Sequence, residues 1–446
     1  MKCIEDANGC LRRSLLSTAV SALVLFLAIA CHGGGYLHWE SSAFLLNYTA
    51  ERPLLQIIFD PLRNDWGLYQ CRELSYFFDY LDANIIYFLL KQGIVCFVSP
   101  ISVMLMLFCI WLQQYAGRRL FPRIPERFFI FYALALALYP AFTEVIFFRS
   151  SKLLAAAGLG ILIFGSALRR LKDSGFWGRK AVICSGAVLA VLADRQGVFF
   201  VTAFTGILAV MQFMKFSYTQ KDIVRVCAGV VFAGIAANVL LVPLLIRAIN
   251  GYFPDFSYQA DFKITCSALF QAVEFVFANI GNAFCGIDSK GAAVCGGVIL
   301  SSILMLLLRN SRRIPLYAVC GMFAVLTVCA WMMVSRHALI MDEGVIFSGY
   351  FTPSMMIFSF FLFAAVERLP EKLRKLSILL PLAVVVLRLM PYFTPEKLFH
   401  EDKYQVIYQN ATPKFEHAVK NPGCEYRKFL MPYRLELLLE KLNGRR

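Results

Sequence analysis

The sequence predicts an all-α membrane protein, a polytopic bundle of about eleven transmembrane helices. Three observations predict this class. The 446 residues are 59% hydrophobic and only 16% charged, whereas soluble domains carry about 25% charged residues. The mean hydropathy is +0.64. Apolar runs recur along the chain, most of them close to the ~20 residues that cross a hydrocarbon core of about 30 Å.

The apolar runs give the expected helices in chain order. They lie near 14–31, 94–113, 128–142, 152–168, 181–193, 198–214, 223–247, 291–308, 315–334, 346–366 and 376–392. Residues 181–214 are divided because a polar segment, 193–197, interrupts them, and short helices at such a break often line a cavity. We expect a transmembrane domain over 1–392 and a small, mostly helical tail over 393–446.

Basic residues orient this bundle. Half of the 44 Lys and Arg residues fall in segments 2–13, 118–127, 169–180, 215–225, 309–313 and 368–375, which alternate with the remaining connections. Such clusters mark cytoplasmic loops, so the amino terminus is expected inside the cell and the carboxyl tail outside. We expect the inner membrane of a bacterium. Because the +15 net charge is distributed in this way, it does not indicate nucleic-acid binding.

The expected outer side holds two large loops, 32–93 and 248–290. The first contains the unusually polar stretch "NDWGLYQCRELSYFFDYLDANII" at 64–86. On a helix, Arg72, Ser75, Tyr76, Asp79 and Asp82 share one side, while Leu74, Phe77, Phe78 and Leu81 lie largely on another. Residues 68–83 therefore fit a helix on the outer membrane surface. This composition is also explained without any catalytic role.

Further polar residues fall on the same expected side of the bilayer. The candidates for a site are Glu40, Asp65, Arg72, Glu73, Glu144, Arg149, Lys152, Asp194, Arg195, Gln196, His337 and Tyr350. Each alone also fits a solvated loop residue or an interfacial anchor. Together, carboxylates beside arginines at a lipid boundary suit a site that binds a lipid phosphate and removes a proton.

This topology resembles the GT-C superfamily of membrane glycosyltransferases, which use sugars linked to polyprenyl phosphate. The resemblance consists of an inside amino terminus, a long first outer loop with surface helices, short helices further on and an external tail. It implies a catalytic base just after the first helix, at Glu40 in "HWE", with Asp65 as second choice. "SGYFTP" at 348–353, which contains Tyr350, is similar to the late Arg-Tyr-x-x-Pro element, with Gly349 at the arginine position.

The resemblance also implies a reaction and its partners. Glu40 would take a proton from an acceptor hydroxyl as it attacks the sugar with inversion, and Arg149, Lys152 and Arg195 would hold the departing lipid phosphate. The partners would be a polyprenyl-phosphate-linked sugar, membrane lipids and a glycan or lipid acceptor. We assign no cofactor and leave a divalent metal open.

Two other functions remain open. A flippase or secondary transporter for a lipid-linked glycan usually carries mid-helix charges and two related halves, whereas the charges here lie at helix edges. An O-antigen polymerase or ligase usually has its large loop late in the chain, whereas the longest loop here comes first. Walker A, GxSxG and HExxH patterns are absent from the sequence, which disfavours an ATPase, a serine hydrolase or a zincin.

Overall fold

The computed structural model describes residues 2–31, 53–59, 72–92, 98–139, 150–168, 176–213, 221–253, 265–285, 290–309, 316–335 and 351–389. Within these ranges all regular structure is helical. The helices are α1 (Lys2–Cys31), α3 (Leu54–Phe59), α5 (Glu73–Lys91), α6 (Pro100–Leu120), α7 (Glu126–Ala137), α9 (Ser151–Ala167), α10 (Phe176–Ala193), α11 (Arg195–Phe213), α12 (Lys221–Ala236), the π-helical η4 (Ala237–Leu241), α13 (Val242–Asn250), α14 (Cys266–Cys285), α15 (Lys290–Arg309), α16 (Leu316–Ser335), α18 (Thr352–Glu367), α19 (Glu371–Leu376) and α20 (Leu379–Leu389).

The predicted fold class is confirmed. Each of the eleven apolar runs overlaps one of these helices, and the predicted break at 193–197 is the junction between α10 and α11. By length and composition, 8–27, 100–120, 195–213 and 221–250 suffice to cross a membrane, and shorter apolar helices accompany them. The range 248–290, which we expected to be an outer loop, contains α14, and residues 393–446 lie outside the described residues.

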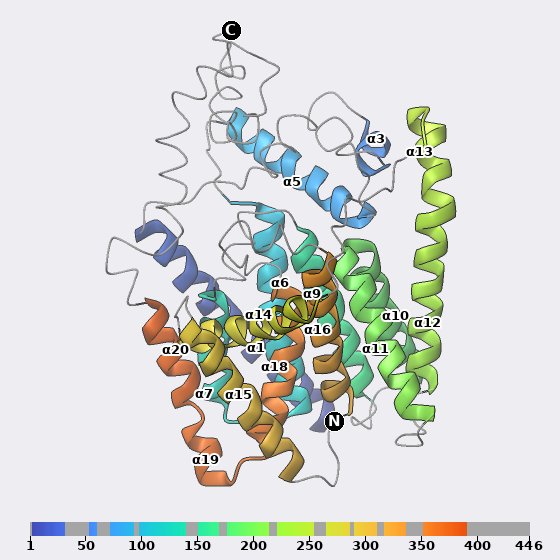
Figure 1. Cartoon of the computed structure of the whole chain (residues 1–446). Helices are drawn as coiled ribbons and strands as arrows, with labels where there is room; N and C mark the ends of the chain where they lie inside the picture. The colour runs from blue at the N-terminus through green and yellow to red at the C-terminus, as the bar shows by residue number, and fades with distance from the viewer. Residues whose placement is uncertain are drawn as a thin grey trace.

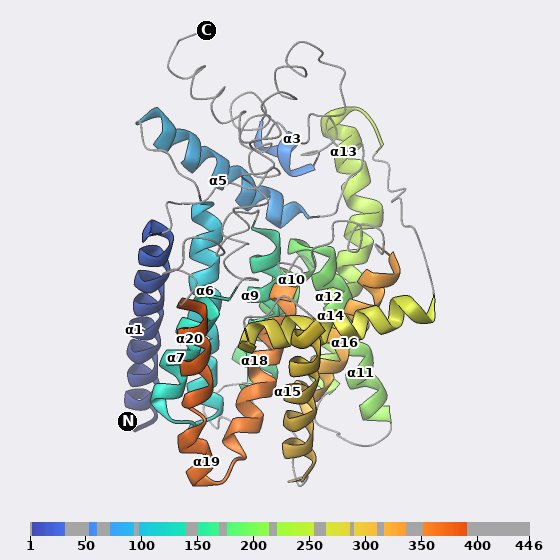
Figure 2. The same cartoon turned by 60° about the vertical axis from the view of Figure 1, so that its left-hand side comes forward.

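The helices are arranged as an upright bundle with one covered end. α5 lies across this end and α3 lies near it, whereas the amino terminus and α19 lie at the opposite end (Figures 1 and 2). α14 also runs across the bundle (Figure 2), and α12 to α13 form a long helix at its edge (Figure 1). We call the end beneath α5 the capped end and the other the amino-terminal end.

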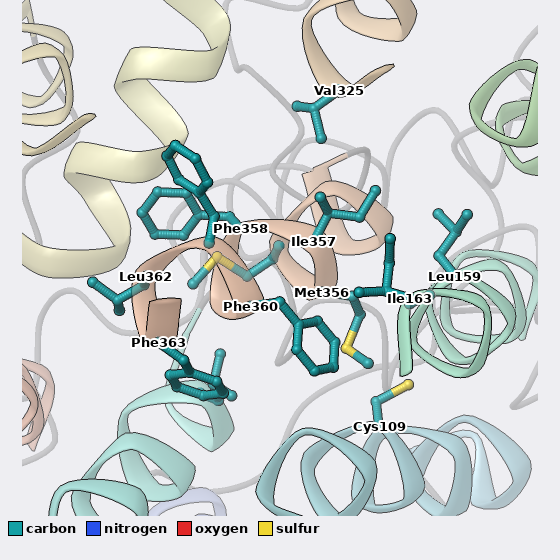
Figure 3. Packing of buried hydrophobic residues seen from close by; sticks show 14 of the residues in the cluster. Cys109, Leu159, Ile163, Val325, Met356, Ile357, Phe358, Phe360, Leu362 and Phe363 are labelled. Atoms are coloured by element: carbon teal, nitrogen blue, oxygen red, sulfur yellow. The ribbon is translucent and has the colours of Figure 1, made fainter. Parts of the chain in front are cut away.

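α18 forms the centre of the bundle. Every residue from Thr352 to Val366 is buried, which is expected for a helix that is apolar on all sides and surrounded by other helices. Its side chains interdigitate with those of neighbouring helices, for example Met356 with Cys109 and Ile163 (Figure 3). The polar Ser359 is satisfied there, because Gln113 Nε2 donates to it at 3.0 Å and Tyr132 Oη lies 2.6 Å away.

A partly buried ion pair between α6 and α7 also contacts α1. Arg118 Nη2 and Nε donate to Glu126 Oε1 at 2.7 and 2.9 Å. Arg118 Nη1 also donates to Ser14 Oγ at 3.1 Å. Through Arg118, this contact holds α1 against α6 and α7.

Candidate functional site

The polar side of α5 faces the bundle. Arg72, just before the helix, and Ser75, Tyr76, Asp79 and Asp82 are all buried, whereas Leu74, Phe77, Phe78 and Leu81 are only partly buried. A helix that only lies on a membrane surface keeps its polar face in water. α5 instead presents its charges to the ends of the helices beneath it.

Two carboxylates of α5 bind helix N-termini. Asp82 Oδ1 accepts from the backbone N–H of Ile101, in the first turn of α6, at 2.8 Å. Asp79 Oδ1 accepts from the backbone N–H and the hydroxyl of Ser150, which precedes α9, at 3.0 and 2.8 Å. The first N–H groups of a helix have no partner within it and carry partial positive charge. Asp79 and Asp82 therefore dock α5 by capping two helices of the bundle.

Asp194 supplies the same contact for a third helix and also binds two cations. It precedes α11, and its Oδ1 accepts from the backbone N–H of Gln196 at 2.8 Å. Its Oδ2 lies 3.2 Å from Lys152 Nζ, at the start of α9, and 3.4 Å from Arg72 Nε. Asp194 is 1%, Lys152 3% and Arg72 7% exposed. We call these three residues the charge cluster.

The charge cluster contains more positive than negative side chains. It combines two cations with one carboxylate, so its formal charge is +1. Among the described residues, the hydroxyl of Ser151 and Oε1 of Gln196 have no hydrogen-bond partner although both residues are buried. Buried polar atoms are nearly always satisfied in folded proteins. The Ser151 hydroxyl and Gln196 Oε1 therefore remain available to a ligand or to water.

Two carboxyl groups at the capped end have shifted pKa values. Burial raises the pKa of Asp82 to about 7, with a further increase from the charge of Asp79, although the hydrogen bonds from Ser99 and Ile101 oppose it. Burial also disfavours ionised Asp194, but Arg72, Lys152 and the Gln196 N–H outweigh it and hold the pKa of Asp194 below its ordinary value. The lowered pKa keeps Asp194 ionised at neutral pH, whereas the raised pKa of Asp82 lies near neutral pH.

The structure brings together part of the predicted site. Arg72, Lys152, Asp194 and Gln196 meet at the capped end. Glu73 begins α5 and Arg195 begins α11, and both are only partly buried. Predicted residues outside the described ranges are Glu40, Asp65, Glu144, Arg149, His337 and Tyr350.

The serines of the site were not among the predicted residues. Ser150 and Ser151 precede Lys152 directly, and the pair begins an apolar run. Serine is favoured before a helix, so the sequence "RSSK" signals the helix start but not the approach of Asp79. Within the described ranges no group of three or more His, Cys, Asp or Glu side chains is arranged to hold a metal ion.

The fold and the site define a polytopic membrane protein with a buried polar cluster beneath a transverse helix. No protein-family model and no curated protein sequence matches the chain. The structure is similar to the crystal structure of ArnT from Cupriavidus metallidurans bound to undecaprenyl phosphate, with TM-score 0.51 and 14% identity over 96% of this chain and 77% of that chain. The apo structure of the same protein matches with TM-score 0.50, 14% identity and the same coverage. ArnT is a GT-C glycosyltransferase, so the expected GT-C-like fold is confirmed.

Proposed function

We propose that this protein is a GT-C-type glycosyltransferase. It transfers a sugar from a polyprenyl-phosphate donor to a glycan or lipid acceptor, on the outer side of a bacterial inner membrane. The observation that carries the proposal is the charge cluster, because Arg72 and Lys152 converge at the end of a bundle with this fold. Arginine and lysine are the usual ligands of phosphate.

The ArnT structure supports the choice of donor. That protein was crystallised with undecaprenyl phosphate, a lipid whose phosphate remains when a sugar is transferred away. In this chain, Arg72 and Lys152 bind the phosphate of the donor and stabilise the charge that develops as it departs.

The reaction needs a base in addition to this cluster. We assign that role to Glu40, with Asp65 as second choice. The acceptor oxygen forms a bond to the anomeric carbon, the bond from that carbon to the phosphate oxygen breaks, and Glu40 takes the hydroxyl proton. The polyprenyl phosphate leaves with the bonding electron pair.

The direct test uses purified protein, polyprenyl phosphates carrying radiolabelled sugars, and a membrane lipid and glycan extract that supplies the acceptor. Release of label from the lipid is expected with the wild type and is expected to fall at least about a hundredfold in Glu40→Gln, the lower end of typical general-base contributions. Glu371→Gln is the matched control, since Glu371 is exposed on α19 and pairs with Lys375 at the amino-terminal end.

Three outcomes decide between the alternatives. Near-normal release by Glu40→Gln moves the base to Asp65. Release by neither the wild type nor any variant, for every labelled sugar, contradicts the proposal. Uptake of a lipid-linked glycan into sealed vesicles without loss of sugar from the lipid would assign the protein to the flippase class instead.

A further inference from the structure

We propose that Asp194 sets the charge preference of the phosphate site. It allows the singly charged phosphodiester of the donor to bind and weakens binding of the more highly charged phosphomonoester product. This inference rests on the proposed function, and it gives Asp194 a positioning and selectivity role rather than a catalytic one.

The charge of the lipid phosphate changes during the proposed reaction. A polyprenyl-phosphate sugar is a phosphodiester with one negative charge. When the bond between sugar and phosphate oxygen breaks, the oxygen keeps the electron pair and the lipid becomes a phosphomonoester. Phosphomonoesters carry about −1.5 to −2 charges at pH 7. The site therefore meets a more negative ligand after the reaction than before it.

Asp194 contacts both cations of the cluster through the same oxygen. Lys152 Nζ and Arg72 Nε both approach Oδ2 of Asp194, at 3.2 and 3.4 Å. A phosphate that contacts both cations therefore lies close to this carboxylate. Coulomb repulsion scales with the charge of the ligand, so Asp194 opposes a dianion about twice as strongly as a monoanion.

Asp194 is fixed in position and buried. Its Oδ1 accepts from the backbone N–H of Gln196 at 2.8 Å, so it cannot turn away without uncapping α11. With 1% of its surface exposed, it is poorly screened by water. The repulsion is thus built into the site and persists when a ligand binds.

The inference predicts how the site discriminates between donor and product. The three residues of the cluster carry a formal charge of +1, and the repulsion from Asp194 is about twice as large for a monoester dianion as for a diester. Asp194→Asn raises the formal charge to +2 and keeps an oxygen that accepts from Gln196. The variant is expected to hold its product and to be inhibited by it.

The experiment measures binding of undecaprenyl phosphate and of its methyl diester, which has the charge of the donor without a sugar. In Asp194→Asn, the affinity for the monoester relative to the diester is expected to rise at least about tenfold, equivalent to ~1.4 kcal/mol. Asp222→Asn is the matched control, because Asp222, in the first turn of α12, pairs with Lys180 at 3.8 Å and not with the charge cluster, and it should leave the ratio unchanged.

Loss of Asp194 leaves Arg72 and Lys152 without their shared carboxylate, which can prevent folding. The second comparison therefore sets Lys152→Met against Lys152→Met/Asp194→Asn, which differ by the same single charge. The twofold margin of this test corresponds to ~0.4 kcal/mol of experimental spread. If the monoester-to-diester affinity ratio changes by less than about twofold in either comparison, the inference is overturned. If wild-type protein binds neither lipid, the phosphate site itself is wrong. If it binds both and only the ratio fails to move, the proposed function stands and the role of Asp194 falls.

Discussion

Asp82 links the docking of α5 to pH. Its carboxyl group is buried, lies near Asp79, and accepts from the first turn of α6. Its pKa of about 7 in the folded protein exceeds the ordinary value of 3.8. Between these values the folded protein holds a proton that the unfolded chain has lost. Folding stability therefore decreases as pH rises through this window and becomes level above it.

Replacing Asp82 tests this pH dependence of the folding stability. Asp82→Asn keeps an acceptor for Ile101 N–H but does not titrate. The fall in stability of the wild type from pH 5 to pH 8, on the order of 1–4 kcal/mol, is expected to become smaller in the variant. Thermal unfolding in detergent at a series of pH values measures it. Parallel profiles for the two proteins would show that Asp82 is not the group responsible.

At this scale the sequence predicts which residues gather but not what they contact. The helical spacing of Arg72, Asp79 and Asp82 is readable from the sequence, and so is the polar break at Asp194. The partners of these residues start α6, α9 and α11, in segments distant along the chain. Helical periodicity says which residues share a side of a helix, but not whether that side meets water or protein.

At the scale of elements, glycines allow α9 and α10 to pack closely. A Cβ on Gly158 would lie 2.5 Å from the backbone nitrogen of Ala190, and one on Gly186 would lie 2.5 Å from that of Leu162. Small residues permit such approach between membrane helices, where packing replaces the hydrophobic effect as the driving force. This contact positions the N-terminus of α9, and with it Lys152, beside the end of α10 and Asp194.

Adding one methyl group tests the close approach. Gly158→Ala is expected to lower stability by about 1–3 kcal/mol, since the obstacle is backbone that cannot rotate away. Gly206→Ala is the control: Gly206 lies in α11 with no atom near the added Cβ, and alanine there should be neutral or add up to about 1 kcal/mol. Thermal unfolding followed by gel filtration separates the two. Equal behaviour of both variants contradicts a tight α9–α10 contact.

Apolar runs in the sequence do not predict every helix of the structure. The runs predict the helices because a bilayer requires continuous apolar segments. They do not predict α14, whose sequence includes Gln271, Glu274 and two asparagines. Its end is stabilised by a distant residue, because Arg388 of α20 donates to the carbonyl oxygen of Asn282 and to its Oδ1. A helix that runs across a bundle need not carry an uninterrupted apolar run.

Over the whole molecule, the basic segments that predict orientation also complete the helices. Arg179 donates to the carbonyl oxygens of Gly165 and Ser166, at the end of α9, each at 3.3 Å. Arg368 donates to that of Leu307, near the end of α15, at 2.7 Å. Cations at helix C-termini are favourable, so the arginines from which the orientation is predicted also stabilise the ends of α9 and α15.

The orientation itself gives the last prediction. α5 and α19 lie at opposite ends of the bundle (Figures 1 and 2). The basic segments predict that the end with α19 faces the cytoplasm. Single cysteines at Gln92, exposed after α5, and Lys372, exposed in α19, report on the two sides when introduced into a chain whose native cysteines are replaced. A membrane-impermeant maleimide should label position 92 in intact cells and position 372 only after permeabilisation. Labelling of both positions in intact cells would contradict their placement on opposite sides of the membrane. Labelling of position 372 but not position 92 would keep the fold and place the charge cluster on the cytoplasmic side. The proposed reaction would then need a cytoplasmic supply of lipid-linked sugar.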